Sequence, residues 1–108
     1  MNNQLRIISG RYKSRLINIP DKPNLRPSKA FIRETLFNVI DIGSCSSSLD
    51  LFSGSGILSF EALSRGIKSA TLIEKDIDLV RSIKSNMSVL KIEGASVVKS
   101  MVNKFLLS

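Results

Sequence analysis

The chain has 108 residues, of which 43% are hydrophobic and 23% charged, so it is large enough for one globular domain and no more. It has no histidine and a single cysteine, Cys45, which excludes both an internal disulfide and a histidine-activated cysteine nucleophile. No apolar run approaches the roughly 20 residues of a membrane span, and the first residues lack a signal-peptide core, so we expect a soluble cytoplasmic protein.

The excess positive charge is confined to the N-terminal third. Residues 1–33 hold eight of the 16 basic side chains but only one of the 9 acids, Asp21, whereas the rest of the chain is balanced. Such an asymmetry favours an anionic partner, most often a phosphate backbone. The alternative is a basic face that only aids solubility.

Two β-rich runs, residues 5–10 and 13–19, predict an N-terminal hairpin, and the three prolines of residues 20–27 predict an irregular connection after it. We expect residues 1–27 to form a basic appendage outside the α/β core and to contact RNA. Tyr12, the only tyrosine, could stack on a base or pack on the hairpin.

A helix is predicted after this connection. Ser28 can cap it, and it runs to about Ile40 with Ile32, Leu36 and Phe37 on the same face as Ile40. A polar loop, residues 43–48, then leads to the first strand of the core.

The stretch 49–66 organises the predicted core. An apolar run at 49–52 ends in Ser-Gly-Ser-Gly and passes into a helical pattern at about 57–65, which is typical of a strand, a tight turn and a helix. Gly54 and Gly56 have no Cβ, so the turn can take positive φ and a ligand can approach the main chain. The N–H groups at the start of the helix favour negative charge on a ligand.

The remaining elements continue the alternation. A strand at 69–74 is followed by a helix capped by Asp76, which Gly94 should end; a strand at 95–99 and a short helical or irregular tail at 102–107 follow. The apolar residues expected to face the sheet from this helix are Val80, Ile83, Met87 and Leu90. Right-handed crossovers predict an α/β fold with a parallel sheet and helices on both faces.

Two acids flank the glycine turn. Asp50 lies four residues before the first glycine, and Glu74 ends the next predicted strand, 18 residues after Gly56. An acid at the position of Glu74 accepts hydrogen bonds from ribose hydroxyls in doubly wound folds. Asp50 suits a cationic ammonium or sulfonium and would repel a pyrophosphate, which favours S-adenosylmethionine over a dinucleotide. Ser59 also departs from the dinucleotide fingerprint. A purely structural role for the turn is the alternative if the two glycines are considered alone.

Several segments form a family pattern, in order, along nearly the whole chain. They are residues 6–13 (Arg-Ile-Ile-Ser-Gly-Arg-Tyr-Lys), 25–28 with 32–38, 49–56 with 60–66, and 73–76. In these segments the chain resembles the bacterial small-subunit ribosomal RNA guanine-N2 methyltransferases of the RsmD type. The first two are fairly specific to that family, whereas many methyltransferases share the glycine motif.

The resemblance implies a Rossmann-like S-adenosylmethionine-dependent methyltransferase fold and methylation of the exocyclic N2 amine of a guanine in ribosomal RNA or a small-subunit assembly particle. We expect a monomer without a metal. The implied cofactor-binding residues are Asp50 near the ammonium, Ser53, Gly54 and Gly56 around the methionine part, and Glu74 with Lys75 at the ribose. The implied RNA-binding residues are Arg6, Arg11, Lys13, Arg15 and Arg26, and Arg26 and Ser28 would lie near the cofactor's carboxylate or the substrate entrance.

Two departures from the family pattern limit this interpretation. Met101 stands where the family has an acid that contacts adenine, and no Asp/Asn-Pro-Pro-aromatic motif follows to orient the target amine and stack an extruded base. We therefore interpret residues 28–108 as the truncated, cofactor-binding half of a methyltransferase domain, with no catalytic residue assigned. The alternatives are an RNA-binding fragment without turnover and a dinucleotide-binding domain.

Overall fold

The centre of the molecule is a parallel three-stranded sheet in the order β3-β4-β5. In the computed structural model, residues 3–22, 25, 30–40, 45–51 and 53–107 are described. The sheet strands are β3 (Ser47–Asp50), β4 (Ser69–Glu74) and β5 (Ala95–Lys99). The predicted parallel α/β arrangement is therefore confirmed.

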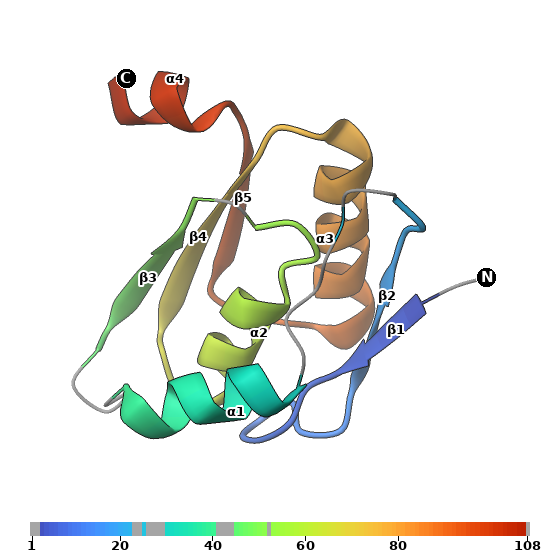
Figure 1. Ribbon diagram of the computed structural model, residues 1–108, viewed down its shortest axis with the longest axis vertical. Helices are drawn as coiled ribbons and strands as arrows, with labels where there is room; N and C mark the ends of the chain where they lie inside the picture. Colours follow the sequence, from blue (N-terminus) through green and yellow to red (C-terminus); the bar gives the residue numbers. More distant parts are fainter. Residues whose placement is uncertain (1–2, 23–24, 26–29, 41–44, 52, 108) are drawn as a thin grey trace.

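Two helices cover one face of this sheet, and a short C-terminal helix contacts the other face near the carboxyl ends of the strands. Ala70 and Leu72 of β4 belong to one core cluster with residues of α2 (Ile57–Ser64) and α3 (Ile77–Leu90), so these two helices share a face. Figure 1 shows α2 and α3 between the sheet and the N-terminal hairpin. Successive side chains of a strand point to opposite faces, so Ile73 lies on the other face, where it lines a pocket with Val102 of α4 (Val102–Leu107).

The N-terminal hairpin forms a second sheet. Strands β1 (Asn3–Arg6) and β2 (Leu16–Ile19) pair antiparallel, so the predicted hairpin is present with shorter strands and a longer connection, residues 7–15. Helix α1 (Ala30–Val39) follows, and Ser28, the predicted cap, lies outside the described residues.

The expectation that the hairpin stands outside the core is wrong. Ile7, Tyr12, Ile17 and Ile19 belong to the same buried cluster as Phe60 of α2, so one core spans both sides of the boundary expected at residue 27. The apolar face of the hairpin is covered by α2 and α3 because water contact there would be costly.

The structure decides between the two roles considered for Tyr12 in favour of packing. Its side chain is 2% exposed, and its hydroxyl accepts a hydrogen bond from the backbone N–H of Glu93 at 3.0 Å. Base stacking on this ring is therefore excluded.

A side-chain cap sets the first end of α3, and a backbone conformation sets the other. The Asp76 carboxylate caps the helix as predicted, accepting hydrogen bonds from the N–H groups of Asp78 (2.8 Å) and Leu79 (3.3 Å). The helix ends at Leu90, earlier than the predicted stop at Gly94, because Lys91 takes the left-handed conformation with φ 54°.

Within the described part of the chain, no helix has the length and apolar character needed to cross a membrane.

Candidate functional site at the carboxyl ends of the strands

The turn between β3 and α2 requires glycine for two different reasons. Gly54 and Gly56 have φ values of +52° and +83°, a region that other L-residues rarely adopt. A Cβ on Gly56 would lie 3.3 Å from atoms of Ile83, Leu72 and Phe60, so this glycine also permits close packing of α2 on the sheet. Among the described residues, a Cβ on Gly54 would meet only the Leu25 side chain, at 3.2 Å.

Glu74 joins the end of β4 to this turn. Its Oε1 accepts a hydrogen bond from the Gly54 N–H at 3.0 Å, and its Oε2 accepts one from the Asp76 N–H at 2.8 Å. A carboxylate offers about four acceptor positions, so capacity remains on both oxygens for the hydroxyls of a ligand.

Asp50 lies on the same face of the sheet as Glu74. It is aligned with Leu72 across β3 and β4, and Glu74 is two residues beyond Leu72, so the three side chains point to one side. The Asp50 Oδ2 accepts a hydrogen bond from the Ser59 hydroxyl at 3.2 Å, and Ser53 donates its hydroxyl to the Asp50 carbonyl at 3.1 Å. The two acids therefore flank the turn from the same side of the sheet.

A pocket of about 300 Å³ opens beside Glu74. Its lining combines the ends of β3, β4 and β5 with the start of α4, and its members are Leu51, Ile73, Glu74, Lys75, Ser100, Met101, Val102 and Asn103. Glu74 and Lys75 both line this pocket, whereas Asp50 and the glycine turn do not. Asp50 instead lines a second cleft, along β3.

Ser100 and Asn103 are polar pocket residues that the sequence analysis missed. The only signal for them is topological, because they follow a parallel strand whose carboxyl end adjoins that of β4. Met101 lines the pocket at the position where an acid was expected, so this part of the pocket is more apolar than the family pattern implies.

The segment after the hairpin is attached beside the turn. Lys22 pairs with Asp78 at 2.8 Å and with Asp76 at 3.3 Å. These hydrogen bonds, first to Asp78 and then to Asp76, raise the pKa of Lys22. Desolvation by itself would raise the pKa of Asp76, but the N–H groups of Leu79 and Asp78, together with Lys22, outweigh it and lower that pKa.

The candidate RNA-binding residues gather on the connection between β1 and β2. Arg11, Lys13 and Arg15 are exposed, and the guanidinium groups of both arginines lie 5.2 Å from the centre of the buried Tyr12 ring. Arg6, also exposed, donates to the Ser14 carbonyl at 3.3 Å. Arg26 lies outside the described residues.

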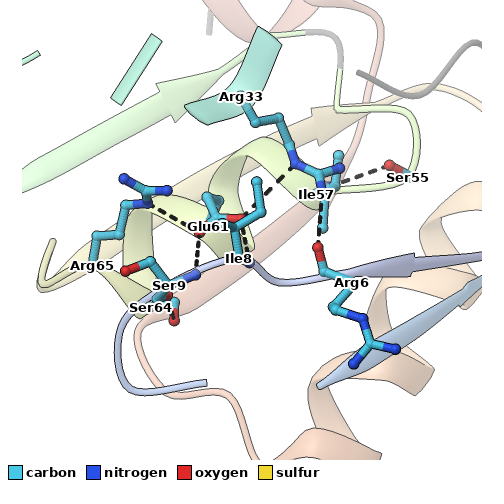
Figure 2. A network of polar contacts seen from close by, with 9 residues as sticks. All are labelled: Arg6, Ile8, Ser9, Arg33, Ser55, Ile57, Glu61, Ser64 and Arg65. Carbon is cyan, nitrogen blue, oxygen red and sulfur yellow. Dashed lines mark hydrogen bonds and ion pairs between the residues drawn. The ribbon is translucent and has the colours of Figure 1, made fainter. Parts of the chain in front are cut away.

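A buried charged network was also missed by the sequence analysis. Glu61 of α2 is 0% exposed and Arg33 of α1 is 2% exposed, so one of the eight N-terminal basic side chains is internal. Figure 2 shows Glu61 between Arg33 and Arg65, next to the backbone of Ile8 and Ser9.

In the described residues, no group of three or more histidine, cysteine, aspartate or glutamate side chains is arranged to hold a metal.

The chain is similar to proteins that are named as ribosomal RNA methyltransferases. Residues 5–108 match the family described as Conserved hypothetical protein 95. The chain is 44% identical, over 97% of its length, to Ribosomal RNA small subunit methyltransferase D of Escherichia coli, and 36% identical, over 82% of its length, to the Putative rRNA methyltransferase YlbH of Bacillus subtilis. It covers 54% and 48% of these proteins, so it spans about half the length of the curated relatives it matches.

The fold is likewise similar to a solved structure. The putative methyltransferase yhhF from Escherichia coli superposes with a TM-score of 0.86 at 40% identity, and the match covers 96% of this chain and 56% of that one.

Proposed function

Because the chain belongs to the family described as Conserved hypothetical protein 95, we propose that it supplies the cofactor-binding part of an S-adenosylmethionine-dependent methyltransferase acting on small-subunit ribosomal RNA. The proposed acceptor is the exocyclic N2 amine of a guanine. The names of its relatives support the reaction class, and the guanine specificity rests on the sequence resemblance alone.

The observation that carries this proposal is the environment of Glu74. Its carboxylate is anchored by the Gly54 N–H and lines the pocket at the carboxyl ends of the parallel strands, which is where open α/β sheets bind ligands. The remaining acceptor positions suit two ribose hydroxyls, and Leu51, Ile73 and Met101 offer an apolar wall for a planar base.

The methionine end of the cofactor is assigned to the neighbouring turn. Asp50 and Ser53 adjoin Gly54, and a carboxylate here stabilises a cationic ammonium or sulfonium. When bound, S-adenosylmethionine supplies an electrophilic methyl group, so the protein has mainly to hold the acceptor amine in line with it. In this proposal, the chain's own residues bind and orient the cofactor. The RNA is held by the basic loop, the connection of residues 7–15 between β1 and β2 with its exposed Arg11, Lys13 and Arg15.

Calorimetry with S-adenosylhomocysteine tests the cofactor site. We expect the wild-type chain to bind it, and Asp50→Ala and Gly54→Val each to weaken binding by at least about tenfold, because one removes the cation's partner and the other places a side chain at the close-approach position. Asp21→Ala removes an exposed acid elsewhere and serves as the control. Unchanged affinity in both folded variants would refute the assignment, and binding of NAD without a response to S-adenosylhomocysteine would favour the dinucleotide alternative.

RNA binding is tested by reversing charge on the basic loop. Arg11→Glu combined with Lys13→Glu should weaken binding of a labelled small-subunit RNA and flatten its salt dependence by about 1.4 in log–log slope, the equivalent of two single-strand phosphate contacts. Affinity for S-adenosylhomocysteine should not change. The control is Arg81→Glu with Lys84→Glu, an equal charge change at two exposed positions of α3. Equal RNA affinity in the two double variants would remove the proposed role of the loop, and salt-sensitive RNA binding without methyl transfer would favour an RNA-binding fragment.

A further inference from the structure

The buried carboxylate of Glu61 attaches the basic loop to α2. Its Oε1 accepts a hydrogen bond from the Ile8 N–H at 2.9 Å, and its Oε2 accepts one from the Ser9 N–H at 3.2 Å (Figure 2). Oε2 also accepts from Arg65 Nε at 3.0 Å, and Arg33 Nε lies 3.9 Å from Oε1. The carboxylate therefore holds two adjacent backbone donors of the N-terminal segment between two guanidinium groups.

Three further contacts bind the same loop to the next turn of α2. The Ser64 hydroxyl accepts from the Tyr12 N–H at 2.9 Å and donates to the Ser9 carbonyl at 2.6 Å, while the Ser64 carbonyl accepts from the Arg11 N–H at 2.7 Å. A Cβ on Gly10 would lie 1.9 Å from that carbonyl oxygen, so the loop sits on the helix with no room for a side chain between them.

The arginines make this arrangement specific for a charged acceptor. Arg33 also donates to the Arg6 carbonyl at 2.8 Å, so it links α1, α2 and β1. Burial lowers the pKa of Arg33, an effect that Glu61 opposes and Arg65 reinforces, yet a guanidinium remains charged at neutral pH. Removing Glu61's charge would leave a buried cation without its carboxylate, which is costly.

From these contacts, and on the premise of the proposed function, we propose that Glu61 is a positioning residue for RNA binding. It fixes the loop that carries Arg11, Lys13 and Arg15 on one end of α2, while the glycine turn forms the other end. With eight residues, α2 is about 12 Å long. The basic side chains are thereby held at a fixed distance from the glycine turn.

The proposal predicts a change in RNA affinity that is opposite in sign to the change expected from net charge alone. Glu61 is fully buried and cannot touch RNA. Removing its negative charge raises the chain's net charge above +7, which by itself should strengthen RNA binding. A weaker complex after neutralisation would therefore report loss of loop position.

Glu61→Gln is the informative variant, with Glu34→Gln on the exposed side of α1 as a control of equal charge change. In either orientation the glutamine NH₂ group faces an N–H donor of the loop or an arginine. We expect Glu61→Gln to bind a labelled RNA of about 20 nucleotides at least about fivefold more weakly than Glu34→Gln, the lower range for coupling between sites. Hydrogen exchange at the Ile8 and Ser9 amides should become faster, and affinity for S-adenosylhomocysteine should stay within about twofold of wild type.

The outcomes separate this inference from the proposed function. RNA affinity in folded Glu61→Gln equal to or above that of Glu34→Gln would overturn the inference, as would an equal loss of RNA and S-adenosylhomocysteine binding. Absence of RNA binding in the wild-type chain would instead overturn the proposed function. If Glu61→Gln does not fold, Ser64→Ala provides the test, with Ser85→Ala, at an exposed position of α3, as its control. Ser64→Ala should bind RNA more weakly than Ser85→Ala. Equal RNA binding in these two variants would refute the positioning role.

Discussion

At the residue scale, Asp76 has two structural roles, because its carboxylate caps α3 and also pairs with Lys22. Its pKa is lowered in the folded protein, so its charge contributes stability above the unfolded-state pKa of about 3.9, and this contribution is lost as pH falls through the lower folded value. Asp76→Asn keeps a capping oxygen but has no charge. We expect its melting temperature to lie below that of the wild type at pH 7 and the difference to shrink as the pH falls below about 3.9, as measured by circular dichroism.

The control for this prediction is Asp21→Asn, which neutralises an exposed acid adjacent in sequence to Lys22. Lys22→Gln should reproduce part of the loss at pH 7, because Lys22, whose pKa is raised, stabilises the fold only while it is protonated. A difference between wild type and Asp76→Asn that persists unchanged at pH 3 would contradict the electrostatic explanation.

Some of these residue-level features could be read from the sequence and others could not. The Asp76 cap follows from local spacing, because a cap involves only near neighbours. The common side of Asp50 and Glu74 depends instead on the register between β3 and β4, which the sequence does not give. Burial of Glu61 and Arg33 could not be predicted, since charged residues are rarely fully buried and their partners lie far along the chain. The one available signal is that Phe60, Ala62 and Leu63 surround Glu61 with apolar residues on a short helix.

At the scale of elements, the hairpin shows where sequence reasoning failed. Its second strand alternates between buried Ile17 and Ile19 and exposed Leu16 and Asn18, which a single apolar face would produce. The pattern predicts that one face is covered, but it does not identify the covering element. That element proves to include α3, where Asn86 donates its side-chain amide to the Asn18 carbonyl at 2.8 Å.

Integration of the hairpin into the core can be tested at two adjacent positions of β2. Ile17 is 0% exposed and Leu16 is 38% exposed. Ile17→Ala should lower the free energy of unfolding by about 2–5 kcal/mol because it leaves a cavity in the shared core, whereas Leu16→Ala should cost less than about 1 kcal/mol. Urea unfolding followed by far-UV circular dichroism measures both, and each transition should stay single and cooperative. Similar small losses in both variants would restore the appendage that the sequence suggested.

At the scale of the whole molecule, the parallel sheet was predictable, because strands that alternate with helices favour parallel pairing. What the sequence could not reveal is the surface left uncovered. In the described residues β3 pairs only with β4, and a cleft of about 510 Å³ runs along its other edge. Apolar side chains of α1, β3 and α2 line it, among them Leu36, Phe37, Leu49 and Leu58, together with Ile40, which follows α1.

We expect this cleft to be the main exposed hydrophobic surface of the described residues. Leu49 is 52% exposed beside an unpaired strand edge, a combination that soluble proteins usually avoid. The wild-type chain should therefore bind the dye ANS, and Leu49→Lys should lower the bound fluorescence by roughly half or more, because the ammonium group interrupts the apolar strip. Val89→Lys is the matched control, since Val89 is 73% exposed on α3 and does not line the cleft. Sedimentation at the same concentration distinguishes dye binding to the expected monomer from binding to aggregates. Equal dye binding by Leu49→Lys and Val89→Lys would show that the exposed apolar surface lies elsewhere than at the β3 edge.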